Sequence, residues 1–305
     1  MSDRAARVIV MTGATSGIGA QALERLAREP GNRMLLGARG TGRAVPAGVQ
    51  TVPLDLASLT SVREFAQDVV RNLARARIDV LVLNAAVQAR HLDGRTADGF
   101  ESTFGVNHLA HYLLVRLLLP YLSDGGRIVI TTSDTHDPAI IPFGPRHLDP
   151  AALAHPAERG AVAAGMRAYA ASKLCNLLTA RSLAARDEVR ARRIQVVAYN
   201  PGLTGGTNLM QLSTRAQRAA SAVIRPALTI IGRFRPAFAM GTPERAGEVL
   251  AQLATGEIAP PPESVYVSLV RGEVTFPEPS ALARDDATRD DLWRRSQELV
   301  GPLAP

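Results

Sequence analysis

The sequence predicts an α/β fold, in which a doubly wound parallel sheet of about seven strands carries helices on both faces. Short runs rich in β-branched residues alternate along the chain with longer runs of helical periodicity, which is typical of β-α-β units. The run at residues 78–83 is almost continuously apolar, as expected for a strand that helices cover on both faces. Because crossovers between parallel strands are right-handed, repeated β-α-β units produce a doubly wound sheet.

The strands and helices that we expect follow one another in a regular order. The strands cover residues 7–11, 33–37, 49–53, 78–83, 126–132, 194–199 and 265–270. The helices cover residues 21–29, 58–75, 100–122, 165–186, 242–254 and 286–300. Pro30 and Gly31 end the first helix, and Thr242 caps the fifth. Glu64 is placed to complete a capping box with Ser61 in the first turn of the second helix.

Two segments interrupt this alternation, at residues 137–164 and 208–241. Both follow strands at the carboxyl edge of the sheet, where open α/β sheets bind ligands. No linker or internal repeat divides the chain. We therefore expect residues 1–305 to form a single domain, with these two segments as inserts that cover the ligand.

Length and composition exclude several classes of protein. A chain of 305 residues buries enough surface to fold without disulfide bonds, and its single cysteine excludes an internal disulfide. The sequence contains no apolar run long enough for a transmembrane helix, and its first residues lack the features of a signal peptide. We therefore expect a cytoplasmic protein.

The net charge of +7 comes almost entirely from arginine, since only one of the 35 basic residues is lysine. The densest basic clusters, at residues 71–77 and 186–193, close predicted helices, where cations complement the helix dipole. No basic stripe interleaved with aromatic residues is present, so we expect no nucleic-acid partner. A small ligand that carries phosphate groups is the favoured partner.

A glycine-rich turn follows the first predicted strand and opens the first helix. It reads Thr12-Gly13-Ala14-Thr15-Ser16-Gly17-Ile18-Gly19. Gly13 allows a tight turn, Gly17 lets the backbone approach a pyrophosphate, and Gly19 lets the helix pack on the strand. The free N–H groups at the start of the helix are suited to bind the phosphates.

This T-G-x-x-x-G-x-G spacing resembles the signature of the short-chain dehydrogenase/reductase family, whose members have a Rossmann-type fold and bind NAD or NADP. The resemblance covers nearly the whole chain and implies contacts to each part of the cofactor. The implied cofactor-binding residues are Gly13, Ser16, Gly17, Ile18 and Gly19 at the pyrophosphate, Asp55 and Leu56 at the adenine, Asn84 and Ala85 at the ribose, and Pro201 and Gly202 with Thr204 or Thr207 at the nicotinamide. Ala86 replaces the usual glycine and Gly206 the usual threonine, so the choice between Thr204 and Thr207 stays open.

The end of the second strand indicates that the cofactor is NADP(H). This end faces the adenosine ribose, where an acidic residue would bind the 2′-hydroxyl group of NAD. Arg39 stands there instead, and residues 37–40 include no acid. A guanidinium group suits the 2′-phosphate of NADP.

Tyr169 and Lys173 lie four residues apart, so both project from one face of the same predicted helix. Reduction of a carbonyl group needs a proton donor at its oxygen, and an ammonium group beside a tyrosine lowers the pKa of the phenol. Lys173 is also the only lysine in the chain, which indicates chemistry that arginine cannot replace.

Ser133 closes the fifth predicted strand, and Asn107 lies on the helix before that strand. With Tyr169 and Lys173, they match the Asn-Ser-Tyr-Lys tetrad of the family residue by residue. The resemblance implies that Tyr169 donates the proton and that Ser133 polarises the substrate oxygen. It also implies that Lys173 holds the nicotinamide ribose, with Tyr169 beside it, and that Asn107 supports a water path to Lys173.

Four further runs look like the retinol dehydrogenase and protochlorophyllide reductase branch of the family. They cover residues 54–59, 107–112, 172–176 and 292–296. That branch acts on bulky apolar molecules. We therefore expect an NADP(H)-dependent oxidoreductase that transfers a hydride between nicotinamide and the carbonyl or alcohol group of such a substrate, under apolar residues of the two inserts.

Two alternatives stay open: a reductase of C=C double bonds, as in the protochlorophyllide branch, and a catalytically silent protein that senses NADP(H). His108 and His111 lack further ligands at metal-binding spacing, so we expect packing roles and no metal. His136 is a candidate for lining the substrate site. The family often pairs subunits through the Tyr-Lys helix, so a homodimer is one option, although the insert before this helix would obstruct such pairing.

Overall fold

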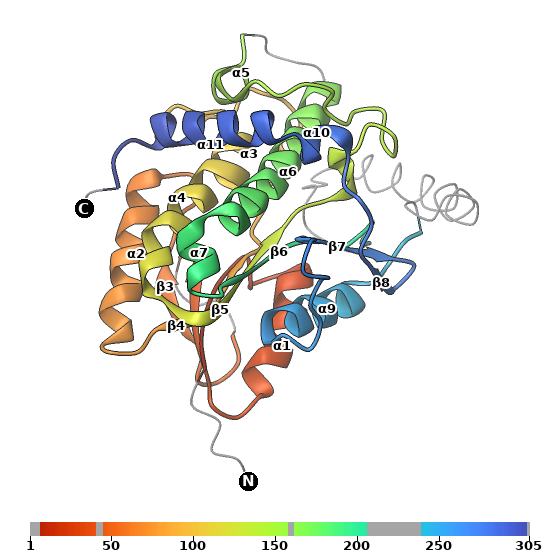
Figure 1. Cartoon of the computed structure of the whole chain (residues 1–305). Helices are drawn as coiled ribbons and strands as arrows, with labels where there is room; N and C mark the ends of the chain where they lie inside the picture. The colour runs from red at the N-terminus through yellow and green to blue at the C-terminus, as the bar shows by residue number, and fades with distance from the viewer. Residues whose placement is uncertain (1–6, 41–44, 158–161, 206–238, 304–305) are drawn as a thin grey trace, which may run out of the picture.

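The computed structural model describes residues 7–40, 45–157, 162–205 and 239–303, and its centre is a sheet of eight strands (Figure 1). The strands lie in the order β3-β2-β1-β4-β5-β6-β7-β8. They are β1 (Arg7–Thr12), β2 (Asn32–Ala38), β3 (Gln50–Pro53), β4 (Ile78–Leu83), β5 (Leu122–Thr131), β6 (Gln195–Asn200), β7 (Tyr266–Val270) and β8 (Glu273–Thr275). All neighbouring pairs are parallel except β7 and β8. The doubly wound parallel sheet predicted from the sequence is confirmed.

The short strand β8 is absent from the sequence prediction. Val270 pairs with Glu273 across a two-residue turn, in which Arg271 and Gly272 have φ angles of 54° and 80°. Hairpin turns with two positive φ angles usually carry Asn-Gly or Asp-Gly. Arginine rarely adopts such an angle, so only Gly272 matches the residue pattern that normally identifies this turn in a sequence.

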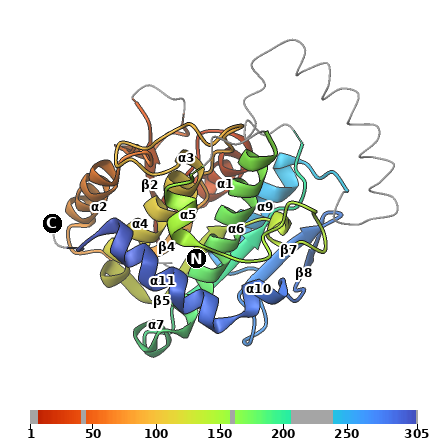
Figure 2. The same cartoon turned by 90° about the horizontal axis from the view of Figure 1, so that it is seen from above.

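Helices cover both faces of the sheet (Figures 1 and 2). The longer ones are α1 (Gly17–Arg28), α2 (Leu59–Leu73), α4 (Ala110–Leu118), α6 (Val162–Ala185), α9 (Pro243–Thr255) and α11 (Asp286–Val300). The shorter ones are α3 (Ser102–Phe104), α5 (Pro150–Ala154), α7 (Asp187–Ala191) and α10 (Ala281–Arg284). α1 and α9 pack together on one face, and α2, α4 and α6 cover the other. Buried apolar residues form one cluster on each face.

The start of α2 differs in detail from the prediction. The side chain of Ser58 is the N-cap and accepts a hydrogen bond from the Ser61 N–H at 3.2 Å. The hydroxyl of Ser61 instead accepts the N–H of Asp55 at 3.0 Å. The predicted capping box of Ser61 and Glu64 is therefore wrong, because Ser61 already lies inside the helix.

The helix predicted at residues 100–122 is present as an unbroken helical stretch from Ser102 to Tyr121, but its hydrogen-bonding pattern changes along its length. The structure divides this region into α3, the π-helical turn η1 (Gly105–Leu109), α4 and the 3-10 turn η2 (Leu119–Tyr121). β5 then begins at Leu122, earlier than predicted. Isolated π-helical turns within a helix are frequent at functional sites. The residue at the centre of η1 is Asn107.

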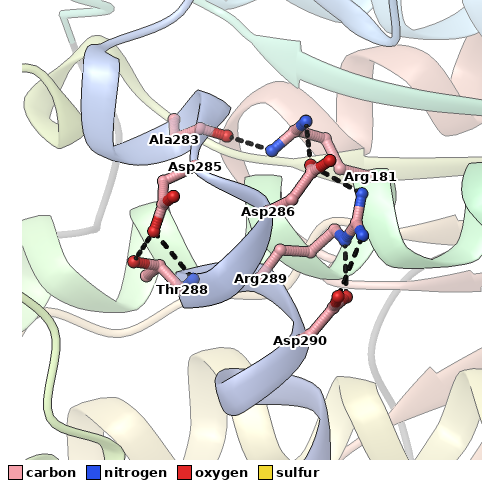
Figure 3. A network of polar contacts seen from close by, with 7 residues as sticks. All are labelled: Arg181, Ala283, Asp285, Asp286, Thr288, Arg289 and Asp290. Atoms are coloured by element: carbon pink, nitrogen blue, oxygen red, sulfur yellow. Dashed lines mark hydrogen bonds and ion pairs between the residues drawn. The ribbon is translucent and has the colours of Figure 1, made fainter.

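The last helix, α11, lies against α4 and α6, and Arg181 of α6 fixes its start (Figures 2 and 3). The Arg181 guanidinium group donates to the Ala283 carbonyl at 2.8 Å and to the Asp286 carboxylate at 2.8 Å. The Asp285 carboxylate caps α11 by accepting the Thr288 N–H at 2.8 Å. These contacts explain why α11 begins at Asp286, as predicted from the sequence.

Candidate active site

The glycine-rich turn between β1 and α1 is packed so closely that it excludes side chains. Gly13 has a φ of 66°, and a Cβ atom there would lie 2.5 Å from the Cα of Ala85. Gly17 has a φ of 55°. A Cβ atom on Gly19 would lie 1.9 Å from the carbonyl oxygen of Gly13. The positions of these three glycines therefore follow from positive φ or from close backbone approach.

The N-cap residue of α1 does not cap the helix with its side chain. This residue, Ser16, makes no side-chain hydrogen bond to the helix, and the first turn holds no acidic residue. By contrast, Ser58, Thr242 and Asp285 cap α2, α9 and α11 with their side chains. Helix N-termini of this kind offer N–H groups to anions, so the residues present fit a pyrophosphate.

Two polar side chains tie the end of β1 to the ends of β4 and β5. Asn84, after β4, donates from Nδ2 to the Gly13 carbonyl at 3.0 Å and accepts at Oδ1 from the Thr131 hydroxyl at 3.0 Å. The Thr12 hydroxyl accepts the N–H groups of Asn84 and Ala85 at 3.1 and 3.2 Å. Asn84 and Ala85 are therefore held beside the glycine turn, at the carboxyl edge of the sheet.

The candidates for the adenosine part of the cofactor lie near the ends of β2 and β3. Arg39 is exposed just beyond β2. Asp55 is also exposed, and its Oδ1 accepts the Ala57 N–H at 3.0 Å. Leu56 and Ile18 are partly buried against the two apolar clusters. The charged groups of Arg39 and Asp55 are therefore accessible to a ligand at this edge of the sheet.

The turn after β6 contains Pro201 and Gly202. Gly202 has a φ of 68°, and a Cβ atom there would lie 2.5 Å from the Leu269 carbonyl oxygen, so only glycine fits. The Thr204 hydroxyl donates to the carbonyl groups of Pro201 and Gly202 at 3.2 and 3.3 Å. Thr207 lies outside the described residues, as does most of the insert at 208–241, so the choice between Thr204 and Thr207 stays a prediction.

Asn107 is fully buried in the π-turn η1. Its side chain accepts the Val87 N–H at 2.8 Å and donates to the Val87 carbonyl at 2.9 Å. Its Nδ2 atom also donates to the Ser172 hydroxyl at 3.0 Å. The Asn107 side chain thus holds η1 between α6 and the loop that follows β4.

Lys173 is 1% exposed, and its ammonium group is buried next to the end of β5. Its Nζ donates to the Thr131 carbonyl at 3.2 Å and lies 5.5 Å from the ring centre of Tyr169. The Thr132 hydroxyl donates to the main-chain carbonyl of Lys173 at 2.6 Å, which ties β5 to α6. Burial lowers the pKa of Lys173 to about 7, because an amine away from water favours its neutral form.

The surroundings of Tyr169 differ from those expected. Burial raises the pKa of its phenol, and the Asp134 carboxylate raises it further. Desolvation and this negative charge account for the raised pKa of Tyr169, and the lowering by Lys173 that the sequence predicts is not found. Sequence reasoning missed Asp134, because its position directly after Ser133 does not by itself show that its carboxylate acts on Tyr169.

Ser133 begins the 3-10 turn η3 (Asp134–His136) at the end of β5. Its hydroxyl donates to Asp134 Oδ1 at 3.3 Å and accepts the Thr135 N–H at 3.3 Å. His136 is 1% exposed, donates from Nδ1 to the Ser133 carbonyl at 2.7 Å and accepts the Ser280 N–H at 3.3 Å. His136 therefore supports Ser133 from the core and does not line an open site.

The ends of β1, β4 and β5, the π-turn η1 and the helix α6 thus bring the predicted tetrad beside the glycine turn. Thr131 is the common neighbour, since its carbonyl accepts from Lys173 and its hydroxyl reaches Asn84. A phenol and an ammonium group on one helix, next to an open helix N-terminus, are suited to proton transfer beside a phosphate-bearing ligand.

Comparison with known proteins identifies the family. The model of the family described as short chain dehydrogenase matches residues 7–141. Retinol dehydrogenase 13 of Homo sapiens is 30% identical over 312 residues, which cover 98% of this chain and 86% of that protein. The chain belongs to the short-chain dehydrogenase family. It is therefore an oxidoreductase, and its similarity to the retinol dehydrogenase branch is confirmed.

Other relatives agree with this assignment. Polyprenol dehydrogenase of Mus musculus is 31% identical over 311 residues, covering 97% of this chain and 84% of that protein. The crystal structure of an uncharacterised protein from Mycobacterium Paratuberculosis has a TM-score of 0.69 at 28% identity, covering 97% of this chain and 94% of that one. A short chain dehydrogenase from Burkholderia cenocepacia J2315, solved in complex with NADP, shares the fold with a TM-score of 0.57 at 24% identity, covering 82% and 91%. Within the described residues, no helix combines the length and the apolar character needed to cross a membrane.

Proposed function

We propose that this protein transfers a hydride between NADP(H) and the carbonyl or alcohol group of a bulky, largely apolar substrate, with Tyr169 as proton donor or acceptor. The observation that carries the proposal is the burial of Lys173 behind Tyr169. Burying an amine costs free energy unless it is paired, and among the described residues no carboxylate forms an ion pair with Lys173. A buried amine kept at such a cost points to a role in the chemistry.

The tetrad residues have separate roles in this proposal. When bound, NADPH supplies the hydride. Tyr169 donates its proton to the substrate oxygen, and the Ser133 hydroxyl binds the same oxygen. Lys173 stabilises the tyrosinate that remains and binds the nicotinamide ribose. Asn107 supports the water path that returns a proton to Lys173.

The protonation of Tyr169 suits it to act as the acid in carbonyl reduction. Burial and the Asp134 carboxylate raise its pKa, so the phenol stays protonated at neutral pH. A protonated phenol is the acid that carbonyl reduction needs. The hydrogen bond from Ser133 to Asp134 is long, at 3.3 Å, so substrate oxygen can replace Asp134 as the acceptor at low cost.

The preference for NADP(H) rests on Arg39. This side chain is exposed at the end of β2, where a 2′-phosphate is bound in dinucleotide-binding folds. Structures that share the fold have been solved with NADP and with NADH, so the fold is compatible with either cofactor. The charge of Arg39 is what favours the phosphorylated one.

The substrate class rests on relatives and on one insert. Relatives at about the same identity are named for retinol and polyprenol, both bulky apolar alcohols. Ile140, Ile141 and Phe143 are partly buried apolar residues that follow Ser133 and η3 in the sequence, and we propose that they line the substrate site. We further propose a single domain for residues 1–305. A homodimer through α6 would have to accommodate α11, which packs against that helix.

A panel of carbonyl compounds tests the function. The protein is mixed with NADPH or NADH and with ketones of increasing ring size, and the loss of reduced nicotinamide absorbance is followed. We expect the highest kcat/KM for NADPH with ring-sized apolar ketones. Equal kcat/KM for acetone-sized and ring-sized ketones would overturn the substrate class. Product analysis separates carbonyl from C=C reduction, and NADPH binding without turnover of any compound would select the sensing protein.

A further inference from the structure

A buried histidine connects the cofactor turn with the π-turn of the tetrad. His111, on α4, is 2% exposed. Its Nε2 atom lies 3.0 Å from the Thr12 hydroxyl, and its Nδ1 atom lies 3.1 Å from the main-chain carbonyl oxygen of Asn107. One imidazole ring therefore joins the end of β1 to the residue at the centre of η1.

The protons in this bridge can be assigned from its partners. A carbonyl oxygen only accepts hydrogen bonds, so Nδ1 of His111 carries a proton and donates it to Asn107. The Thr12 hydroxyl already accepts the N–H groups of Asn84 and Ala85, so it donates its own proton to Nε2. Burial lowers the pKa of His111 to about 4, so the ring is neutral and keeps both bonds near neutral pH.

We infer that His111 is a positioning residue that couples the cofactor-binding turn to the main-chain carbonyl of Asn107. Through Thr12, it fixes the loop after β4 beside the glycine turn. Through its Nδ1 proton, it fixes the direction of a carbonyl that lies where η1 departs from regular α-helical bonding. The inference rests on the proposed function, because this carbonyl affects catalysis only as part of the proton path to Lys173.

His108 provides a matched control three residues earlier. It is 1% exposed, and burial lowers its pKa to about 3. Its Nε2 atom lies 2.8 Å from the Ser296 hydroxyl of α11, and its ring centre lies 5.1 Å from that of Phe104. His108 is thus as buried as His111 but faces α11 instead of the cofactor turn.

The test compares His111→Phe with His108→Phe. Phenylalanine keeps an aromatic ring of similar size but leaves Thr12 without an acceptor and Asn107 without a donor. Thermal unfolding, the Kd of NADPH, and kcat and KM for one ketone are measured for each. For His111→Phe we expect about a tenfold loss in NADPH affinity and in kcat, with little change in the KM of the ketone, because each unpaired buried polar group costs about that factor. For His108→Phe we expect a lower unfolding temperature with unchanged Kd and kcat.

A conservative variant separates positioning from packing. His111→Gln keeps one donor and one acceptor and should recover part of both losses. It also takes the place of His111→Phe, against His108→Gln, if the phenylalanine variant does not fold. Equal effects of matched variants at the two positions on Kd and kcat would overturn the inference. If the wild-type protein binds NADPH but reduces no carbonyl compound, the proposed function fails, whereas the two NADPH affinities still test the link to the cofactor turn.

Discussion

The two faces of the sheet bury different kinds of side chain. α1 and α9 bury only glycine, alanine, valine and leucine. On the other face, the buried polar residues of η1, α4 and the middle of α6 are Asn107, His108, His111, Ser172, Lys173, Asn176, Thr179 and Ser182. Buried polar groups cost free energy unless they are paired, so their presence on one face marks where the chemistry is arranged.

The apolar face supports the glycine turn by close packing. Gly247 of α9 packs so closely on α1 that a Cβ atom there would lie 2.7 Å from the carbonyl oxygen of Ile18. Ile18 belongs to the first turn of α1, next to the glycine turn. The comparison therefore predicts that substitutions on this face change stability, whereas those of polar residues that bond to the ends of β1 and β5, such as His111 and Lys173, change the reaction.

The largest effect is expected for the reacting groups on the polar face. Tyr169→Phe removes the proposed proton donor, and Lys173→Arg keeps the charge but replaces a compact ammonium group with a wider planar one. Because proton-transfer catalysis contributes about 10²–10⁴-fold, each variant should lose at least about 10²-fold in kcat/KM. Steady-state kinetics with the best ketone measures this loss.

Circular dichroism and NADPH binding are the controls for these two variants, and both should be close to wild type for Tyr169→Phe. A Lys173→Arg protein with nearly wild-type kcat/KM would show that charge alone suffices. The specific role of the single lysine would then be wrong.

On the apolar face, Leu250→Ala should act on stability alone. Leu250 is fully buried on α9 within the cluster that covers β1. A leucine-to-alanine change in a core costs about 2–5 kcal/mol of unfolding free energy. Urea unfolding measures this cost, and kcat/KM in the absence of urea should stay unchanged. A loss of kcat/KM in the fully folded variant would break the division between the two faces.

Much of the fold was predictable because its signals are local. The run at residues 78–83 gives the boundaries of β4 because an almost continuously apolar segment between polar residues has few alternatives. Thr242 caps α9 as predicted, since the cap and the following proline are neighbours in the sequence. Within the site, the glycine turn was predictable for the same reason.

The features that could not be predicted depend on contacts between distant segments. The π-turn at Asn107 is held by the main chain of Val87, twenty residues away in sequence. The effect of Asp134 on Tyr169 requires η3 to pack against α6. Neither contact leaves a periodic or compositional trace in the sequence.

Arg39→Ala, at the edge of the site, is expected to have a smaller effect than the substitutions of Tyr169, Lys173 and Leu250. A charge-assisted contact to the 2′-phosphate would be lost, which weakens NADPH binding by about tenfold or more and leaves NADH binding nearly unchanged. Titration of each cofactor by fluorescence gives the two Kd values. If both cofactors weaken alike, Arg39 has a structural role and the NADP(H) preference is wrong.

The smallest effect, and the one that most sharpens the comparison, is expected for Asp134→Asn. The Asp134 carboxylate raises the pKa of Tyr169, so its removal should lower that pKa. Alcohol oxidation needs the tyrosinate as base, and its rate therefore rises with pH through the pKa of Tyr169. In Asp134→Asn this rise should occur at lower pH, and carbonyl reduction should begin to fall at lower pH as well.

Asp137→Asn is the matched control for this shift. Asp137 lies three residues further along and acts on the pKa values of His136 and Tyr266. Its removal should therefore leave the pH dependence of the reaction unchanged. Burial raises the pKa of Asp134 itself, so the carboxylate loses its charge as the pH falls, and the profiles of wild type and Asp134→Asn should converge at acidic pH. Identical profiles of the two variants across the alkaline range would mean that Asp134 does not act on Tyr169 during the reaction.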